Sequence, residues 1–410
     1  MDKTSIFIVP RSSTSWRGNE AGWITTSGWA AAGQQLWGEA LVTTTDGIFS
    51  PQESMLFPRI PDKASPSVSA NRSIRKFVPE FLITGYKDLQ LKRSKPKIWP
   101  IERSELLNKK KVMMVWERHD LFSGPGRRLA DKLGVPLVIS VEAAVVWEAN
   151  KWGVKRPFWG NWLEKQEAKS LKQADLVSCV SDEVKEKVIA MGVPRHKVIV
   201  SPNRVDSSIF HPKVDGTKIK EKYGLENKRV IGWTGSFRRF HGIDTVVMAF
   251  EKLHAQHPDT VLMLVGDGLE FENIKKLAVN LGLSRQIIMP GKQPFTAVPS
   301  FLANFKIALV SASSAEGFHY SPLKLREYLA MGKAVIAPNA GDLPTLFKEG
   351  IELLLYEAGN VEDLFDKMQI LLRSSDLHAS LEQHARTHFE LEGTWAHELR
   401  KVCSILNIPY

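Results

Sequence analysis

The chain has 410 residues, 43% of them hydrophobic and 24% charged, a composition that fits about two globular domains and excludes peptide hormones, disulfide-knotted miniproteins and single small binding modules. No stretch approaches the roughly 18 apolar residues that span a bilayer, and the N-terminal apolar run breaks at Pro10, so we expect neither a membrane span nor a secretory signal. The net charge of +10 allows nucleic acid, an anionic membrane or a phosphorylated substrate as a partner and does not choose among them.

Apolar runs bounded by turn-forming residues predict five strands in the first half of the chain. Turn formers then cluster in residues 201–216, which predicts the join between two domains. The segment from Ser50 to Lys111 is rich in Pro, Ser and basic residues and should form loops and short helices. The five strands are Ile6–Val9, Ala40–Thr44, Val112–Trp116, Leu137–Val141 and Leu176–Val180, and helices are expected at Thr25–Leu36, Arg127–Leu133 and Trp162–Gln173.

The second half alternates short aliphatic strands with helical patterns, and a last helix is expected from Thr394 to Leu406. Strands that are apolar on both faces and alternate with helices indicate a buried parallel sheet with helices on both sides, as in Rossmann-like domains. The predicted strands are Val230–Trp233, Val261–Val265, Gln286–Met289, Ile307–Val310, Ala334–Ala337 and Leu353–Leu355.

Two compositional features concentrate in the first half. The segment from Lys87 to Lys111 holds nine basic residues against three acidic ones, and ten of the twelve tryptophans precede residue 163. The two cysteines, Cys179 and Cys403, form neither a disulfide framework nor a metal-type pair, so we expect a reducing, cytoplasmic compartment.

Three loops of the second half follow strands directly, where parallel sheets bind anionic ligands. In residues 315–333, Ser321 and Pro322 resemble a helix N-cap and first helical residue, with Lys324 and Glu327 three apart on the helix that follows. Such a lysine suits a diphosphate and such a carboxylate suits ribose hydroxyls, whereas the simpler interpretation is a surface ion pair. The other two loops are residues 234–242, with Gly235, Ser236, Arg238, Arg239 and His241, and residues 265–268, with Gly266.

The second half resembles the donor-binding domain of the GT-B glycosyltransferases, specifically the large retaining family four. The resemblance lies in GSFRRFHGIDTVVMAF, LMLVGDGLEFENIKKLA, PGKQPFTAVPSFLANFKIALV and EGFHYSPLKLREYLAMGKAVIA, in that order, and it extends back more faintly to cover about three quarters of the chain. The resemblance implies a GT-B fold of two Rossmann-like domains facing each other across a cleft. Residues 1–205 would bind the acceptor, residues 206–393 would bind the nucleotide-sugar donor, and residues 394–410 would form a helix that crosses back to the first domain.

The chain departs from this family at three positions. Ser236 and His241 occupy places where the family commonly has an arginine and a lysine, and the first glutamate of the family's two-glutamate signature is replaced by His319, with Glu316 three residues earlier. Glu327 matches the second glutamate, and whether Glu316 or His319 meets the donor sugar is open. The donor-binding residues that the resemblance implies are Gly235, Ser236, Arg238, Arg239, His241, Gly266, Gly291, Lys292, Ser321, Pro322, Leu323, Lys324 and Glu327.

Other chemistry finds less support. Gly266 and Gly268 lack the third glycine of an NAD fingerprint, and His384 with His388 lacks a third metal ligand. The sequence contains no Asp-x-Asp pair, so we expect no metal and no cofactor beyond the nucleotide-sugar co-substrate. In the first domain, Asn19 to Gly22 should form an acceptor loop, and His119 and Glu142 are candidates for either catalytic or structural roles.

The expected activity is transfer of a sugar from a nucleotide-diphosphate donor to a hydroxyl of a glycan or lipid-linked acceptor, of hexosyltransferase type with retention of configuration, in polysaccharide or glycoconjugate synthesis. Alternatives are an epimerase or phosphorylase of the same fold, or a non-catalytic protein that binds nucleic acid or a membrane. Nucleic acid is disfavoured because the motifs place the diphosphate in the second domain. The basic and aromatic excess then predicts an anionic acceptor at the inner face of a membrane, with Lys92, Arg93, Lys95 and Lys97 engaging phosphates.

Overall fold

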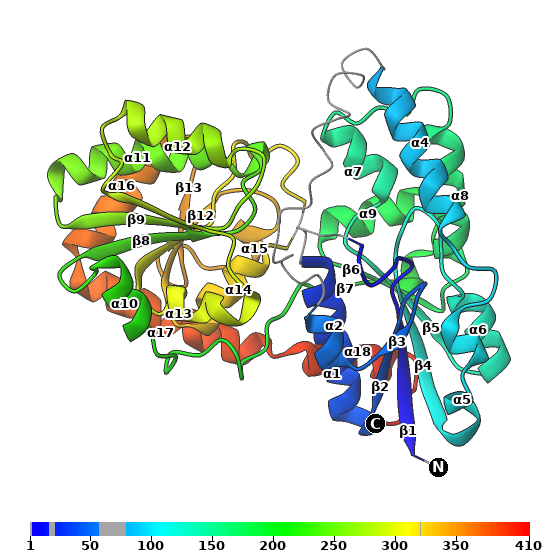
Figure 1. Ribbon diagram of the computed structural model, residues 1–410. Helices are drawn as coiled ribbons and strands as arrows, with labels where there is room; N and C mark the ends of the chain where they lie inside the picture. Colours follow the sequence, from blue (N-terminus) through cyan, green and yellow to red (C-terminus); the bar gives the residue numbers. More distant parts are fainter. Residues whose placement is uncertain (1, 16–20, 57–78, 320) are drawn as a thin grey trace. The chain divides into compact units, whose positions relative to one another are not determined.

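The computed structural model describes residues 2–15, 21–56, 79–319 and 321–410 and divides the chain into two compact units (Figure 1). Unit 1 comprises Met1–Asn203 together with Trp395–Tyr410, and unit 2 comprises Arg204–Thr394. Each unit contains one sheet with helices on both faces, so each has a Rossmann-like α/β architecture.

Unit 1 is built on a seven-stranded sheet in the order β3-β2-β1-β4-β5-β6-β7, parallel throughout except for the antiparallel edge pair β2 and β3. The sheet consists of β1 (Lys3–Ile8), β2 (Ala40–Thr43), β3 (Ile48–Phe49), β4 (Lys111–Arg118), β5 (Leu137–Val141), β6 (Leu176–Cys179) and β7 (Val198–Val200). The helices are α1 (Ala21–Trp37), α2 (Pro51–Met55), α4 (Glu80–Arg93), α5 (Leu106–Lys109), α6 (Gly126–Leu133), α7 (Val145–Lys151), α8 (Gly160–Lys172), α9 (Asp182–Ala190) and α18 (Trp395–Ile405), with 3-10 turns at Pro100–Arg103 and Arg195–Lys197.

The last helix, α18, belongs to the core of unit 1, as predicted. It lies beside α1 (Figure 1), where the rings of Trp29 and Trp395 are 5.1 Å apart and the indole N–H of Trp37 donates to the carbonyl of Pro409 at 3.1 Å. Close approach of the helices requires Gly28, because a Cβ there would fall 2.3 Å from the indole nitrogen of Trp395. Two of the tryptophans that are abundant in the first half therefore serve to attach the C-terminal helix.

Unit 2 is built on a six-stranded, wholly parallel sheet in the order β10-β9-β8-β11-β12-β13. One hydrophobic cluster joins α11, α12 and α16 to one face, and another joins α13, α14 and α17 to the opposite face (Figure 1). The strands are β8 (Arg229–Thr234), β9 (Thr260–Val265), β10 (Ile287–Gly291), β11 (Phe305–Leu309), β12 (Ala334–Pro338) and β13 (Leu354–Tyr356). The helices are α10 (Thr217–Tyr223), α11 (Ile243–Gln256), α12 (Phe271–Asn280), α13 (Val298–Leu302), α14 (Leu323–Ala330), α15 (Leu343–Leu346), α16 (Val361–Arg373) and α17 (Ser375–Glu392), with 3-10 turns at Arg239–His241 and Phe295–Ala297.

Every strand predicted from the sequence is present, with ends shifted by up to three residues. Two strands were missed, β3 and β7, because two or three residues are too few to establish an alternation. In the segment expected to form only loops and short helices, α4 extends over 14 residues. Among the described residues, no helix combines the length and the apolar character that crossing a bilayer requires.

A cluster of charges in unit 2 ties α14 to the end of α17. Glu392 accepts from Arg204 at 2.7 Å and pairs with Arg326 of α14 and with His388 at 3.1 Å. Burial alone would raise the pKa of Glu392, but His388, Arg326 and Arg204 outweigh it and lower that pKa to about 2. The position of α14 therefore depends on an ionised carboxylate that is mostly buried.

We predict that Glu392→Gln lowers the free energy of unfolding by about 2 to 3 kcal/mol at neutral pH, because it leaves two buried guanidinium groups without their counterion. Since the folded pKa of Glu392 lies below that of an unfolded glutamate, this contribution is present above about pH 4.5 and disappears as the pH falls through about 2. Urea unfolding at several pH values measures it. Glu390→Gln, which removes an exposed pair with Arg386, is the control and should cost under about 1 kcal/mol; equal effects of the two variants would contradict the assignment.

Candidate functional site

The sheet of unit 2 has its topological switch point between β8 and β11. From β8 the chain proceeds outward to β9 and β10, whereas β11 lies on the other side of β8 and leads to β12 and β13. Loops that leave the carboxyl ends of two such strands diverge and leave room for a ligand, which is where open α/β sheets bind nucleotides. The loops after β8 and β11 are two of the three loops in which the sequence placed its candidate residues.

Glycines allow the backbones of these loops to approach closely. At Gly266, after β9, a Cβ would fall 1.8 Å from the carbonyl oxygen of Gly235, after β8. At Gly242, whose φ is +58°, a Cβ would fall 2.8 Å from the backbone nitrogen of Ser313, after β11. Three strand ends are thus brought together around Gly235 in a way that side chains would prevent.

Polar side chains fix the end of β8 to its neighbours. The indole N–H of Trp233 donates to Ser311 Oγ at 2.9 Å, and that hydroxyl donates to the carbonyl of His241 at 2.6 Å. On the other side, the backbone N–H of Thr234 donates to the hydroxyl of Tyr328 in α14 at 2.9 Å. These residues are buried, so the geometry of the site is set by hydrogen bonds inside the protein.

Helix α14 carries Lys324 and Glu327, and both side chains are buried, with 9% and 7% of their surface exposed. The ammonium of Lys324 lies 3.8 Å from the ring centroid of Trp233 and beside Gly235, where a Cβ would meet it at 2.8 Å. It has no hydrogen-bond acceptor in the part of the chain that the structure describes. The interpretation of these two residues as a surface ion pair is therefore wrong.

Burial changes the protonation of both groups. It lowers the pKa of Lys324 to about 7, opposed by the charge of Glu327, and it raises the pKa of Glu327 to about 7, opposed by Lys324. Burial, together with the nearby Lys324 and Arg238, also lowers the pKa of His241 well below its ordinary value, so its imidazole is neutral at physiological pH. An unpartnered cation in this setting would be satisfied by an anionic ligand.

The remaining predicted donor residues surround this centre in different ways. Arg238 and Arg239 are exposed, Ser236, Gly291 and Lys292 are half-buried, and Gly291 has a φ of +76°. Helix α14 begins at Leu323, with Pro322 in the N-cap position, so the N-cap prediction for Ser321 is one residue early. The N-cap residue of α14, Pro322, therefore makes no side-chain hydrogen bond to the first turn of the helix.

Glu316 and His319 occupy different environments. Glu316 is exposed, with its backbone N–H donating to Ser314 Oγ at 3.1 Å. His319 is buried, and its Nδ1 lies 2.7 Å from the carbonyl oxygen of Gly317. His319 therefore has its ring orientation set by the backbone, whereas Glu316 is held only through its own backbone.

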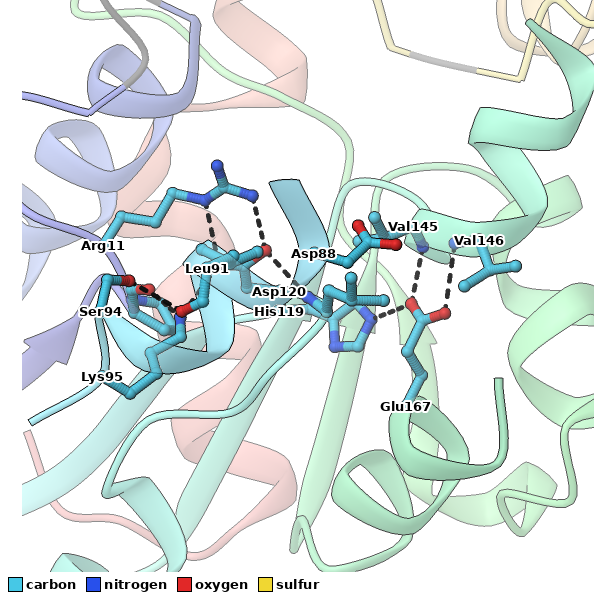
Figure 2. Close-up of polar contacts among 12 residues, drawn as sticks. Arg11, Asp88, Leu91, Ser94, Lys95, His119, Asp120, Val145, Val146 and Glu167 are labelled. Atoms are coloured by element: carbon cyan, nitrogen blue, oxygen red, sulfur yellow. Dashed lines mark hydrogen bonds and ion pairs between the residues drawn. The ribbon is translucent and has the colours of Figure 1, made fainter. Parts of the chain in front are cut away.

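In unit 1, His119 is held by a buried carboxylate. Its Nε2 lies 2.9 Å from Glu167 Oε1, and Glu167 also accepts from the backbone N–H groups of Val145 and Val146 at 2.7 and 3.2 Å (Figure 2). Glu167 has both oxygens engaged and joins β4 to α7 and α8. Of the two roles left open for His119, this geometry favours the structural one.

Glu142 is the more accessible of the two candidates in unit 1. It accepts from Arg118 at 3.3 Å and from the side-chain amide of Asn203 at 3.4 Å, and Arg118 also donates to Thr25 Oγ1 at 2.7 Å. The prediction of a loop at Asn19–Gly22 is wrong for Gly22, because helix α1 begins at Ala21. The carbonyl of Gly22 accepts hydrogen bonds from the hydroxyls of Thr25 and Thr26 in the same helix. Asn19 lies outside the described residues.

Two family models match most of the chain. The model described as "Glycosyl transferases group 1" matches residues 215–388, and "Glycosyltransferase Family 4" matches residues 72–209. The chain belongs to the GT-B glycosyltransferases of the family four type. Each unit thus corresponds to one of the two domains of such a protein.

Several proteins are similar to this glycosyltransferase. N-acetyl-alpha-D-glucosaminyl L-malate synthase of Bacillus anthracis is 29% identical over 217 residues, 53% of this chain and 55% of the relative. The GDP-mannose-dependent alpha-(1-6)-phosphatidylinositol monomannoside mannosyltransferase of Mycolicibacterium smegmatis is 26% identical over 208 residues, 50% of this chain and 53% of the relative. The chain therefore spans about half the length of these curated relatives. Among solved structures, HepE of Anabaena in complex with UDP superposes with a TM-score of 0.65 at 14% identity, covering 98% of this chain and 99% of that one.

Three residues that build the site in this glycosyltransferase belong to no sequence motif and were not predicted. Trp233, Ser311 and Tyr328 position the cation and the loops, yet in the sequence they resemble ordinary strand, loop and helix residues. The aromatic residue at the carboxyl end of β8, directly before the glycine loop, was the one available signal for Trp233.

We predict that replacing both buried charges, in Lys324→Met/Glu327→Gln, raises the free energy of unfolding of the ligand-free glycosyltransferase by about 1 to 3 kcal/mol at pH 7. The pKa of Lys324 is lowered, so burying its charged form costs stability fully below about pH 7. The pKa of Glu327 is raised, so its charged form costs stability fully above about pH 7. Urea unfolding measures the difference, and Glu272→Gln/Lys276→Met on the exposed face of α12 is the control. A destabilised double variant would show instead that the two charges contribute net stability.

Proposed function

We propose that this glycosyltransferase moves a sugar from a nucleotide-diphosphate donor, bound by unit 2, to a hydroxyl of an acceptor bound by unit 1. The observation that carries the proposal is the buried ammonium of Lys324, which lacks a hydrogen-bond acceptor among the described residues and lies beside Gly235 at the switch point of the sheet. A diphosphate would supply the missing acceptor. One helical turn further, Glu327 would accept hydrogen bonds from the ribose hydroxyls.

In the proposed reaction, the bond between the anomeric carbon and the diphosphate oxygen breaks, and a bond from that carbon to the acceptor oxygen forms. The charge that develops on the leaving diphosphate would be stabilised by Lys324, with Arg238 and Arg239 reaching in from the exposed loop after β8. The leaving diphosphate oxygen takes the proton of the acceptor hydroxyl. Transfer on one face of the sugar retains the anomeric configuration, and the absence of an Asp-x-Asp pair from the sequence supports a reaction without a metal.

The acceptor is proposed as a glycan or a lipid-linked molecule of polysaccharide or glycoconjugate synthesis. The similarity of half the chain to a phosphatidylinositol monomannoside mannosyltransferase supports a lipid-linked acceptor. In unit 1, Glu142 is partly accessible, with 27% of its side chain exposed, and is proposed to contact the acceptor.

The test is a screen of UDP-, GDP- and ADP-sugars against candidate acceptors, read by mass spectrometry, with thermal shift by the three nucleotides. We expect one donor to add a hexose mass to an acceptor, with the anomeric configuration of the product preserved in its NMR spectrum. Lys324→Ala and Glu327→Ala should each weaken binding of that nucleotide about 10- to 100-fold, because each removes a charged hydrogen-bonding partner. Lys276→Ala and Glu272→Ala on the exposed face of α12 should bind it normally.

Other outcomes would replace the proposal. An altered nucleotide sugar without any transfer would indicate an epimerase, and turnover that requires inorganic phosphate would indicate a phosphorylase. Undiminished nucleotide binding and turnover in both site variants would show that the donor site lies elsewhere.

The affinity for a UDP-sugar should fall as the pH rises from 6 to 8. Because burial lowers the pKa of Lys324 to about 7, its ammonium is charged at the lower pH and neutral at the higher one, and a diphosphate diester has no titration of its own in this range. Titration calorimetry with UDP-glucose as the probe measures the slope. Lys324→Arg keeps its charge throughout and should flatten the dependence, so an unchanged slope in that variant would assign the effect to another group.

A further inference from the structure

Helix α4 is attached to the rest of unit 1 at its middle and just past its end. Asp88 accepts two hydrogen bonds from the guanidinium of Arg156, at 2.8 and 3.0 Å, and one from the indole of Trp159 at 2.9 Å. Two residues beyond the helix, Lys95 pairs with Asp120 at 3.2 Å. These contacts hold the face of α4 that carries Asp88 against the rest of unit 1. We call the opposite face of the helix its outer face.

Lys95 does not belong to the exposed basic residues, contrary to expectation. Its ammonium donates to the carbonyl of Pro10 as well as to Asp120, and Asp120 receives a bidentate pair of hydrogen bonds from Arg11 at 2.9 and 2.8 Å (Figure 2). Only 11% of the Lys95 side chain is exposed. The positive charge of Lys95 is therefore neutralised inside the protein by Asp120.

The outer face of α4 is apolar. Leu82, Tyr86 and Leu89 are 52%, 61% and 44% exposed, and their spacing of four and three residues places them in one row along the helix. The buried residues Thr84 and Asp88 lie on the opposite side. A soluble helix with one buried face would ordinarily carry polar residues in this row.

Exposed aromatic residues from the chain before and within α8 lie along a flank of α4 next to this row. Phe158 is 83% exposed and its ring lies 6.0 Å from that of Phe81 in an edge-on arrangement. Trp162 is 46% exposed, and the ammonium of Lys92 lies 5.4 Å from its ring centroid. Both contacts place exposed aromatic side chains beside α4, on the flank that carries Phe81 and Lys92.

The charge on α4 and just beyond it is positive. Lys87, Lys92, Arg93 and Lys97 are exposed, and in residues 79–97 the only exposed carboxylate is Glu80. The second acidic residue of that range is Asp88, which is buried and paired with Arg156. We define the α4 surface by its apolar and basic members, Leu82, Tyr86, Lys87, Leu89, Lys92, Arg93, Phe158 and Trp162.

We propose that the α4 surface binds the headgroup region of an anionic phospholipid bilayer. Leucine, phenylalanine, tyrosine and tryptophan side chains insert at the boundary between headgroups and acyl chains, while lysine and arginine bind lipid phosphates. A second copy of the chain would bring like charges together, and a nucleic-acid backbone offers no apolar partner for Leu82 and Leu89. Charge complementarity together with exposed apolar groups favours the membrane.

This proposal assigns the membrane contact of the proposed function to particular residues. It rests on the proposed function for the role of that contact, namely access to a lipid-linked acceptor. Binding to vesicles needs neither donor nor acceptor. Failure of vesicle binding would leave the donor screen intact, and failure of the donor screen would leave vesicle binding intact.

The experiment is co-sedimentation of the full chain with phosphatidylcholine vesicles prepared with and without phosphatidylglycerol. We expect binding only to the anionic vesicles, and a loss of about tenfold or more in Leu82→Ser/Tyr86→Ser/Leu89→Ser and in Lys87→Gln/Lys92→Gln/Arg93→Gln. The matched controls lie on unit 2 and should bind as the unmodified chain does. They are the exposed apolar set Val279→Ser/Ile351→Ser/Ile370→Ser and the exposed basic set Lys275→Gln/Lys276→Gln/Arg285→Gln.

Hydrogen exchange with and without anionic vesicles gives a second measurement that does not depend on variants. Protection confined to residues 80–93 and 156–165 supports the proposal, whereas protection elsewhere with these segments unchanged overturns it. Equal loss in the unit 2 controls, equal binding to neutral vesicles, or a concentration-dependent dimer abolished by the α4 variants would also overturn it. So would binding of single-stranded nucleic acid by the α4 surface in place of vesicles.

Discussion

The burial of one ammonium group is the constraint on which the loops at the switch point of unit 2 depend. Lys324 is placed against the face of Trp233 and beside Gly235, away from any hydrogen-bond acceptor among the described residues. Keeping a cation there is unfavourable, and the surrounding structure is organised to maintain it: Tyr328 ties α14 to β8, and Glu392 ties Arg326 of the same helix to α17. The energetic cost of burying this ammonium is what an anionic ligand would relieve.

In unit 1, by contrast, two buried carboxylates have charged or polar partners near the carboxyl ends of the strands. Asp120 is neutralised by Arg11 and Lys95, and Glu167 holds His119 and the start of α7. These contacts hold the scaffold and leave Glu142 partly accessible. Asp120 and Glu167 therefore have structural roles, and His119, a candidate from the sequence, is held by one of them.

Much of the fold and the donor loops could be predicted from the sequence, because both depend on local patterns. Six aliphatic runs of the second half became the six strands of its sheet, and the glycines at 235, 242 and 266 proved to lie where backbones meet. The burial of Lys324 and Glu327 could not be predicted, since two residues three apart on a helix look the same whether they face water or the core. Lys95 likewise could not be separated from its exposed neighbours in a basic run.

The sequence by itself determined that the chain forms two parallel-sheet units with phosphate-compatible loops after particular strands, since strand and loop identity follow from apolar runs and glycines that are read locally. Only the tertiary structure decided which charges are available for a ligand. Lys324 lies against the ring of Trp233 and has no hydrogen-bond acceptor among the described residues, whereas Lys95 is neutralised by Asp120. Both environments depend on residues brought from elsewhere along the chain. Burial and pairing are properties of those long-range contacts, and no spacing along the chain encodes them.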